Sequence, residues 1–147
     1  MFKNYLLCLL AIVLLISCEN NYKNGMVVSA KYEASKVGVE ILKRGGNAFD
    51  AMIATDLALA VVYPNAGNLG GGGFMVYRLS DGKNGTLDFR EKAPISSKAD
   101  MYLDDNNEVI RGLSQNGALA VGVPGTIAGL FEIHDKFGTL PIKELFQ

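Results

Sequence analysis

The side chains best suited to chemistry lie in one run, Asp88-Phe89-Arg90-Glu91-Lys92-Ala93-Pro94, at the end of an extended stretch. Strand side chains alternate between two faces, so Asp88 and Arg90 share one face and Phe89 takes the other. If the Phe89 face is core, Arg90 faces a cleft or the solvent. Two interpretations stay open. One is a surface ion pair of little energetic weight. The other is a guanidinium held by a neighbouring carboxylate and offered to a substrate carboxylate, which arginine binds through two parallel donors.

A second candidate is the glycine cluster Asn68-Leu69-Gly70-Gly71-Gly72-Gly73-Phe74. A phosphate-binding loop follows a strand and precedes a helix, so that backbone N–H groups converge on the anion. Here the predicted order is reversed, and no Gly-Lys-Ser or Gly-Lys-Thr is present. We therefore interpret the cluster as a tight crossover of two backbones, with a loop lining a small-molecule site as the alternative.

The other polar candidates give weaker signals. His134 is the only histidine and lies on a predicted helix, where we expect it to be packed or half-exposed. Ser114 and Thr126 have no base or orienting acid nearby, and Thr126 is expected to cap a helix. Asp104 and Asp105 fall in a predicted turn. No metal-ligand spacing occurs, so no metal site is expected.

Composition narrows the class of protein. The 147 residues carry 14 Lys plus Arg against 15 Asp plus Glu without a basic block, which argues against a nucleic-acid partner. The length suits one folding unit of roughly 100 to 150 residues. All 17 glycines follow residue 17, which indicates many turns or close backbone approaches.

The first segment has the pattern of an export signal. Lys3 precedes an uncharged run whose apolar part, Leu6–Ile16, is shorter than the ~20 residues of a spanning helix. The run ends Leu15-Ile16-Ser17-Cys18, which resembles the lipobox of bacterial lipoproteins, where the cysteine is lipidated and becomes the mature N-terminus. An ordinary signal peptide with an incidental cysteine is the alternative.

We therefore expect residues 1–17 to be a lipoprotein signal peptide, Cys18 to be lipidated and residues 18–24 to be a polar tether. This places the protein in a bacterial cell envelope, exported and lipid-anchored on the periplasmic side or the cell surface. Cys8 would leave with the signal, so no internal disulfide is expected.

The remaining chain predicts short strands and helices. Strands are expected over Met26–Ala30 and Ala118–Val123, and a hairpin over Phe74–Leu79 and Thr86–Arg90. Helices are expected from Ala34 to a stop at Gly45-Gly46, over Ala51–Val62 with Asp50 as a possible cap, and over Thr126–Phe137. Glu91–Arg111 is expected to be irregular.

The Ala51–Val62 helix is apolar nearly all round, which predicts burial of most of its surface. A further helix is expected to begin at Pro141, and the chain to stop within it.

Four spaced motifs resemble one known family. They are Gly38 to Ala51 (Gly-Val-Glu-Ile-Leu-Lys-Arg-Gly-Gly-Asn-Ala-Phe-Asp-Ala), Gly70 to Met75, Asp88 to Pro94, and Val121 to Thr126. They occur in the order seen at the start of the gamma-glutamyltranspeptidase (glutathione hydrolase) family. Residues 25–147 are thus expected to be the N-terminal part of such a domain.

The resemblance implies an α+β fold that is an incomplete part of a four-layer αββα N-terminal-nucleophile hydrolase sandwich. The family's precursor cleaves itself into large and small subunits. The new N-terminal Thr attacks a γ-glutamyl amide, such as that of glutathione, and the glutamyl group passes to water, an amino acid or a peptide. No metal or organic cofactor is implied. The motif's arginine grips the α-carboxylate of the glutamyl group, and that role falls on Arg90.

The catalytic part of the family pattern has no counterpart here. The four threonines are internal, and none precedes a histidine: Thr55, Thr86, Thr126 and Thr139. We therefore expect no catalytic residue in this chain and no activity from it alone. Its expected partners are a γ-glutamyl substrate, a missing C-terminal segment or small subunit, and a membrane through the lipid on Cys18. The alternative function is a non-catalytic lipoprotein that binds small carboxylated ligands.

Overall fold

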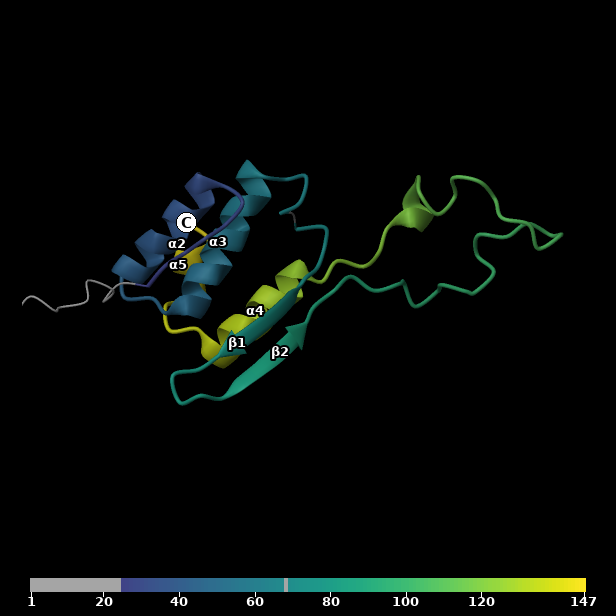
Figure 1. Cartoon of the computed structure of the whole chain (residues 1–147). Helices are drawn as coiled ribbons and strands as arrows, with labels where there is room; N and C mark the ends of the chain where they lie inside the picture. Colours follow the sequence, from purple (N-terminus) through teal and green to yellow (C-terminus); the bar gives the residue numbers. More distant parts are fainter. Residues whose placement is uncertain (1–24, 68) are drawn as a thin grey trace, which may run out of the picture.

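A computed structural model describes residues 25–67 and 69–147. The predicted signal peptide, Cys18 and the tether lie outside the described residues. The elements are α2 (Tyr32–Lys43), α3 (Ala48–Val62), β1 (Phe74–Arg78), β2 (Asn84–Asp88), the 3-10 turn η1 (Ala118–Ala120), α4 (Thr126–Phe137) and α5 (Ile142–Leu145). Figure 1 shows helices gathered beside a two-stranded hairpin, which confirms the α+β class.

The helix α2 follows the predicted spacing. Ala34, Gly38 and Ile41 are its buried residues, and they fall on one face toward α3. The helix ends as the glycine pair predicts, because Gly45 has φ +92° and the Gly46 N–H donates to the Ile41 carbonyl over 3.0 Å.

The helix α3 begins with a reciprocal cap. The Asn47 side chain accepts from the backbone N–H of Phe49 and Asp50, and the Asp50 carboxylate accepts from the Asn47 N–H. The cap residue is therefore Asn47, and Asp50 completes the box from the third helical position. The prediction that α3 is buried on most of its surface is wrong for its last turns, since Val61 is 79% exposed.

The predicted hairpin is confirmed, with its second strand beginning two residues earlier than expected. β1 pairs antiparallel with β2, from Phe74 opposite Asp88 to Arg78 opposite Asn84. Met75 and Tyr77 face the helices, and Phe74 and Val76 lie on the exposed face.

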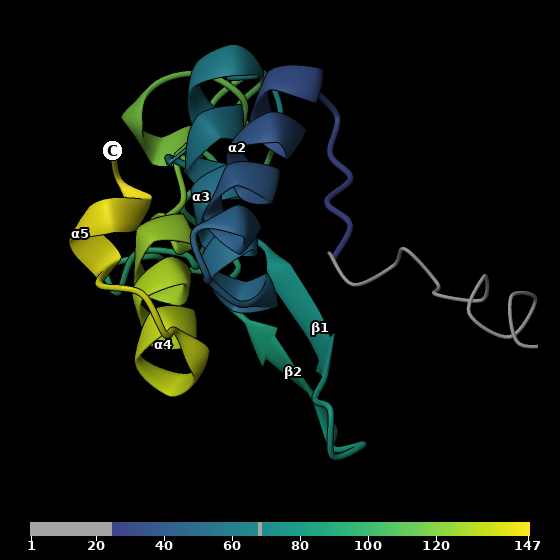
Figure 2. The ribbon, with the colours of Figure 1, turned by 90° about the vertical axis from the view of Figure 1, so that its left-hand side faces the viewer.

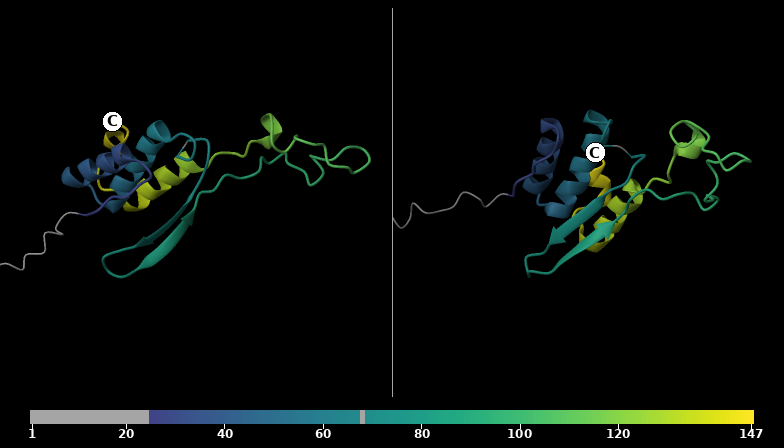
Figure 3. Two further views of the ribbon diagram at one scale, coloured as in Figure 1. Left: turned by 45° about the horizontal axis from the view of Figure 1, so that its top comes forward. Right: turned by 45° about the vertical axis from the view of Figure 1, so that its right-hand side comes forward.

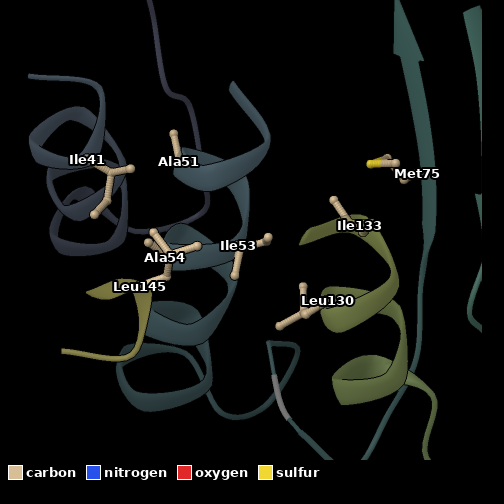
Figure 4. Packing of buried hydrophobic residues seen from close by; sticks show 8 residues of the cluster. All are labelled: Ile41, Ala51, Ile53, Ala54, Met75, Leu130, Ile133 and Leu145. Carbon is tan, nitrogen blue, oxygen red and sulfur yellow. The ribbon is translucent and has the colours of Figure 1, made fainter. Parts of the chain in front are cut away.

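The core forms where three elements meet. Figure 4 shows Ile53 of α3, Leu130 and Ile133 of α4, and Met75 of β1 gathered between the helices and the hairpin. Ile53, Leu130 and Ile133 are fully buried. Next to them the rings of Phe49 and Phe137 stack with centroids 4.4 Å apart.

Two predicted strands do not form. Residues 25–30 are extended, but no strand among the described residues lies beside them to complete a ladder, and Val28 is 82% exposed. In place of a strand over Ala118–Val123 there is η1, entered through Gly117 at φ +84°, followed by a single bridge between Val123 and Lys92.

Residues 93–122, here called the arm, extend away from the helices in Figures 1 and 3. The arm is irregular, as the sequence predicts for Glu91–Arg111, and it begins and ends at the Lys92–Val123 bridge. Within the described ranges, no helix has the length and apolar character needed to cross a membrane.

Candidate carboxylate-binding site

Phe89 fixes the backbone beside Arg90. Its ring fills the space that a side chain at Gly129 of α4 would occupy. Its backbone carbonyl likewise fills the space beside Gly125, the N-cap of α4. Phe89 packs against the core while Arg90 is exposed, so the predicted two-face alternation is confirmed.

The glycine cluster is a crossover of backbones, as its structural interpretation predicts. The Gly71 carbonyl accepts from the N–H groups of Gly125 and Thr126 over 2.8 and 3.1 Å, and the Gly73 carbonyl accepts from the Phe89 N–H over 3.0 Å. A Cβ on Gly72 would stand 2.7 Å from the Arg90 Cα. The cluster thus joins the end of β2 to the start of α4, and Arg90 lies at this junction.

Thr126 is the first residue of α4, whose N-cap is Gly125, so the prediction of Thr126 as the cap is wrong.

The Arg90 guanidinium is largely unengaged. Its side chain is 62% exposed, its Nε lies 3.9 Å from Glu91 Oε1, and its Cζ lies 5.8 Å from the centroid of the Phe74 ring. The Asp88 carboxylate accepts the Arg90 backbone N–H over 3.0 Å and so fixes the main chain rather than the guanidinium. The long contact to Glu91 is worth little in water, which leaves the planar donors of Arg90 available to a ligand.

Arg90 lines a groove of about 430 Å³ between the end of β2 and α4. Lys92 is a second cation on its wall, and Asp88 and Glu132 add two carboxylates. Val123, Pro124 and the glycines of α4 supply an uncharged floor. The charges that line the groove are therefore two cations and two carboxylates, and Arg90 is the cation whose planar donors could hold a carboxylate. Sequence reasoning did not single out Lys92, although its place two residues from Arg90 puts both on one strand-like face.

A buried polar network fixes the entry to α5. Asp50 is fully buried and accepts from the Thr139 hydroxyl over 2.5 Å and from the N–H groups of Thr139 and Leu140. Burial by itself raises the pKa of Asp50, but the hydrogen bonds from Thr139, Asn47 and Leu140 outweigh it and hold the pKa below its ordinary value. From the sequence, Asp50 was predicted only as a possible helix cap. Its bond to Thr139 was not predicted, because the two residues are 89 positions apart.

Asp56 is a second carboxylate that the sequence reasoning passed over. It is half-buried on α3, and burial raises its pKa above the ordinary value. The sequence feature that could have drawn attention to Asp56 is its position as the single charge inside the otherwise apolar run Ala51–Val62.

The weaker candidates remain structural. His134 has a side chain 18% exposed, and its Nε2 lies 2.8 Å from the Leu140 carbonyl oxygen, as expected for a packed histidine. Asp104 caps an exposed turn by accepting from the N–H groups of Asn106 and Glu108, and these bonds lower its pKa. Over residues 25–67 and 69–147, no three His, Cys, Asp or Glu side chains cluster in a way that could hold a metal ion.

Known proteins resemble this chain in sequence and in fold. The profile of the family Gamma-glutamyltranspeptidase matches residues 34–147. The glutathione hydrolase proenzyme of Pseudomonas sp. (strain A14) is 58% identical over 125 residues, which cover 85% of this chain and 22% of that protein. The crystal structure of Helicobacter pylori gamma-glutamyltranspeptidase matches 86% of this chain and 36% of its own, with a TM-score of 0.82 and 48% identity. That of Pseudomonas nitroreducens gamma-glutamyltranspeptidase complexed with L-DON matches 84% of this chain and 36% of its own, with a TM-score of 0.79 and 52% identity.

The α+β arrangement of this chain thus matches part of the solved gamma-glutamyltranspeptidase structures. The chain belongs to the gamma-glutamyltranspeptidase family. It spans about a fifth of the length of the curated relatives it matches.

Proposed function

We propose that this chain acts as the N-terminal part of a glutathione hydrolase whose catalytic threonine lies in further sequence. In this role Arg90 binds the α-carboxylate of a γ-glutamyl group, and the acyl group passes from the threonine to water or to an amine. The observation that carries the proposal is the exposed guanidinium of Arg90 in the groove between β2 and α4. Its planar donors suit a carboxylate, and the backbone around it is held by the glycine crossover.

The chain alone is inactive under this proposal. A site that binds a carboxylate without a nucleophile lowers no barrier to acyl transfer. The larger assembly is a four-layer αββα sandwich in which further strands cover the exposed face of the hairpin and the end of α3.

A chimera tests the proposal directly. In the Helicobacter pylori enzyme, the matching segment is replaced by residues 25–147 of this chain, and hydrolysis of a γ-glutamyl anilide is measured. We expect the chimera to cleave the anilide and the isolated chain to leave it intact. A folded chimera without activity would overturn the proposal. Heat released on titrating glutamate into the isolated chain would instead favour the alternative of a carboxylate-binding lipoprotein, if the chimera is inactive.

We also propose that Cys18 is lipidated and anchors the chain in a bacterial envelope. The lipobox-like run before Cys18 supports this. Expression in a bacterium with a radiolabelled fatty acid should label the wild-type chain, and Cys18→Ser should abolish the label and release the protein from membranes. Cys8→Ser is the matched control and should keep the label, since residue 8 lies in the removed signal. Equal labelling of Cys18→Ser and wild type would contradict the anchor.

A further inference from the structure

Two Asn-Gly pairs in the described part of the chain offer the same backbone chemistry in different surroundings. They are Asn84-Gly85 in β2 and Asn116-Gly117 in the arm, and a further pair, Asn24-Gly25, begins outside the described residues. In this chemistry the glycine backbone nitrogen loses its proton and attacks the side-chain Cγ of the asparagine, and ammonia leaves as a cyclic succinimide closes. Water then opens the ring at either carbonyl and leaves aspartate or isoaspartate. Glycine favours the attack because it has no Cβ beside the nitrogen.

The hairpin holds the backbone nitrogen of Gly85. Antiparallel ladders alternate between pairs that exchange N–H···O bonds and pairs that do not. The Leu79 N–H donates to the Lys83 carbonyl over 2.7 Å, and two residues further along the register Tyr77 stands opposite Gly85, so these two form the next hydrogen-bonded pair. The Tyr77 ring also covers Gly85, because a Cβ there would stand 2.7 Å from its Cζ. The Gly85 nitrogen therefore cannot reach the Asn84 side chain unless the strands separate.

The pair in the arm is open. Asn116 and Gly117 are both exposed and lie in no helix or strand. The Gly117 N–H donates to no acceptor among the described residues. Gly117 has φ +84°, and a Cβ there would meet nothing within 4 Å. The Asn116 amide makes one long contact, from Nδ2 to the Gly112 carbonyl over 3.4 Å, which is weak for a hydrogen bond. In the described part of the chain, no backbone bond has to break before the Gly117 nitrogen meets Cγ of Asn116.

We propose that Asn116 is a site of spontaneous deamidation, and that the β1–β2 ladder protects Asn84 from the same reaction. Water is the only co-reactant that the conversion needs. The free energy of local opening separates the two sites, because it is small in exposed loops and larger where a ladder must come apart. The proposal is independent of the proposed function, since it depends on the arm and the hairpin alone.

The reaction changes the arm in charge and in length. Aspartate and isoaspartate each add a negative charge at residue 116, and isoaspartate also adds a carbon to the main chain. The Tyr102 hydroxyl donates to the Leu119 carbonyl over 2.7 Å and so closes a loop that contains Asn116. Isoaspartate lengthens this loop on the limb that returns to the bridge at Val123.

The test compares the two sites within one molecule. The 147-residue chain is incubated in mildly alkaline water enriched in heavy oxygen, and its tryptic peptides are followed by mass spectrometry. The sites fall on separate peptides, because Arg90, Lys92 and Arg111 lie between them. We expect Asn116 to take up solvent oxygen about tenfold faster than Asn84 or more. In concentrated urea, which removes the ladder, the two rates should become similar, since glycine follows both asparagines.

Two variants assign the label. Asn116→Gln should abolish the uptake at residue 116, because glutamine must close a larger ring that forms more slowly. Asn84→Gln is the matched control and should leave the rate at Asn116 unchanged. Equal rates at Asn84 and Asn116 without urea would overturn the inference, because the ladder then gives no protection. It would also fail if Asn116 takes up label in urea but not in the absence of urea, since the arm then holds the nitrogen or the side chain apart.

Discussion

At the scale of single residues, two carboxylates on α3 differ in what surrounds them. Asp50 is fully buried and receives donors from the Asn47 region and from Thr139 and Leu140. Asp56 is half-buried and has no donor among the described residues. An aspartate therefore stabilises the fold at position 50 and opposes it six residues further along the helix, because hydrogen bonds offset the cost of burial only at the first position.

Asp50→Ala should destabilise the chain by about 2 to 4 kcal/mol, because it removes the Asp50 half of the capping box and leaves the N–H groups of Asn47, Thr139 and Leu140 without this acceptor. Urea denaturation of both forms measures the difference. The pH dependence follows from the lowered pKa of Asp50. Its ionised form stabilises the fold above the unfolded-state pKa of about 4, and this contribution is lost as the pH falls through the folded-state pKa.

Asp50→Asn should therefore flatten the stability profile below about pH 4. Asp105→Ala, a change in an exposed turn, serves as the control and should alter neither the profile nor the urea midpoint. Equal urea midpoints for Asp50→Ala and wild type would contradict a supporting role for the network.

At the scale of elements, the position of α4 depends on the absence of a side chain. Gly129 is buried against the Phe89 ring, and a Cβ there would collide with it. Gly129→Ala should therefore push α4 from β2 and cost about 1 to 3 kcal/mol, as overpacking of a close contact does. Thermal unfolding compares it with Ala128→Ser, an exposed change one residue away that should be near neutral. A Gly129→Ala variant as stable as wild type would show that the contact yields without cost.

Local sequence patterns predicted most of the helices and the hairpin. They did not predict the features that depend on residues far away in the sequence. The glycine pair gave the end of α2, and the hairpin followed from turn residues between two extended runs. Residues 25–30 have strand-like side chains but gain no ladder here, because a strand needs a neighbour that local sequence cannot supply. At the site, the alternation along β2 predicted that Arg90 faces outward. The hydrogen bonds of Asp50 to Thr139 could not be predicted from neighbouring residues, because Thr139 is distant in sequence.

At the scale of the whole molecule, the fold leaves apolar surface uncovered. Several large apolar residues are more than half exposed, among them Met26, Val28, Val61, Phe74 and Val76. They lie on residues 25–30, the end of α3 and the outer face of β1, all of which are surfaces that further strands could cover.

The isolated chain of residues 18–147 should accordingly bind a hydrophobic dye and unfold over a broad temperature range. Fluorescence of the dye and calorimetry check this. The chimera, in which the same surfaces are proposed to be covered, should bind less dye per molecule. A sharp, cooperative transition of the monomeric isolated chain without dye binding would contradict an incomplete core.

Binding of the γ-glutamyl carboxylate by Arg90 is measured most directly in the chimera. Arg90→Lys should reduce kcat/KM for a γ-glutamyl anilide by about 5- to 150-fold, which corresponds to a loss of about 1 to 3 kcal/mol for a charged hydrogen bond. Arg111→Lys, a matched change on the exposed arm, should leave kcat/KM unchanged. If Arg90→Lys and Arg111→Lys both keep the kcat/KM of the unsubstituted chimera, Arg90 does not bind the glutamyl group.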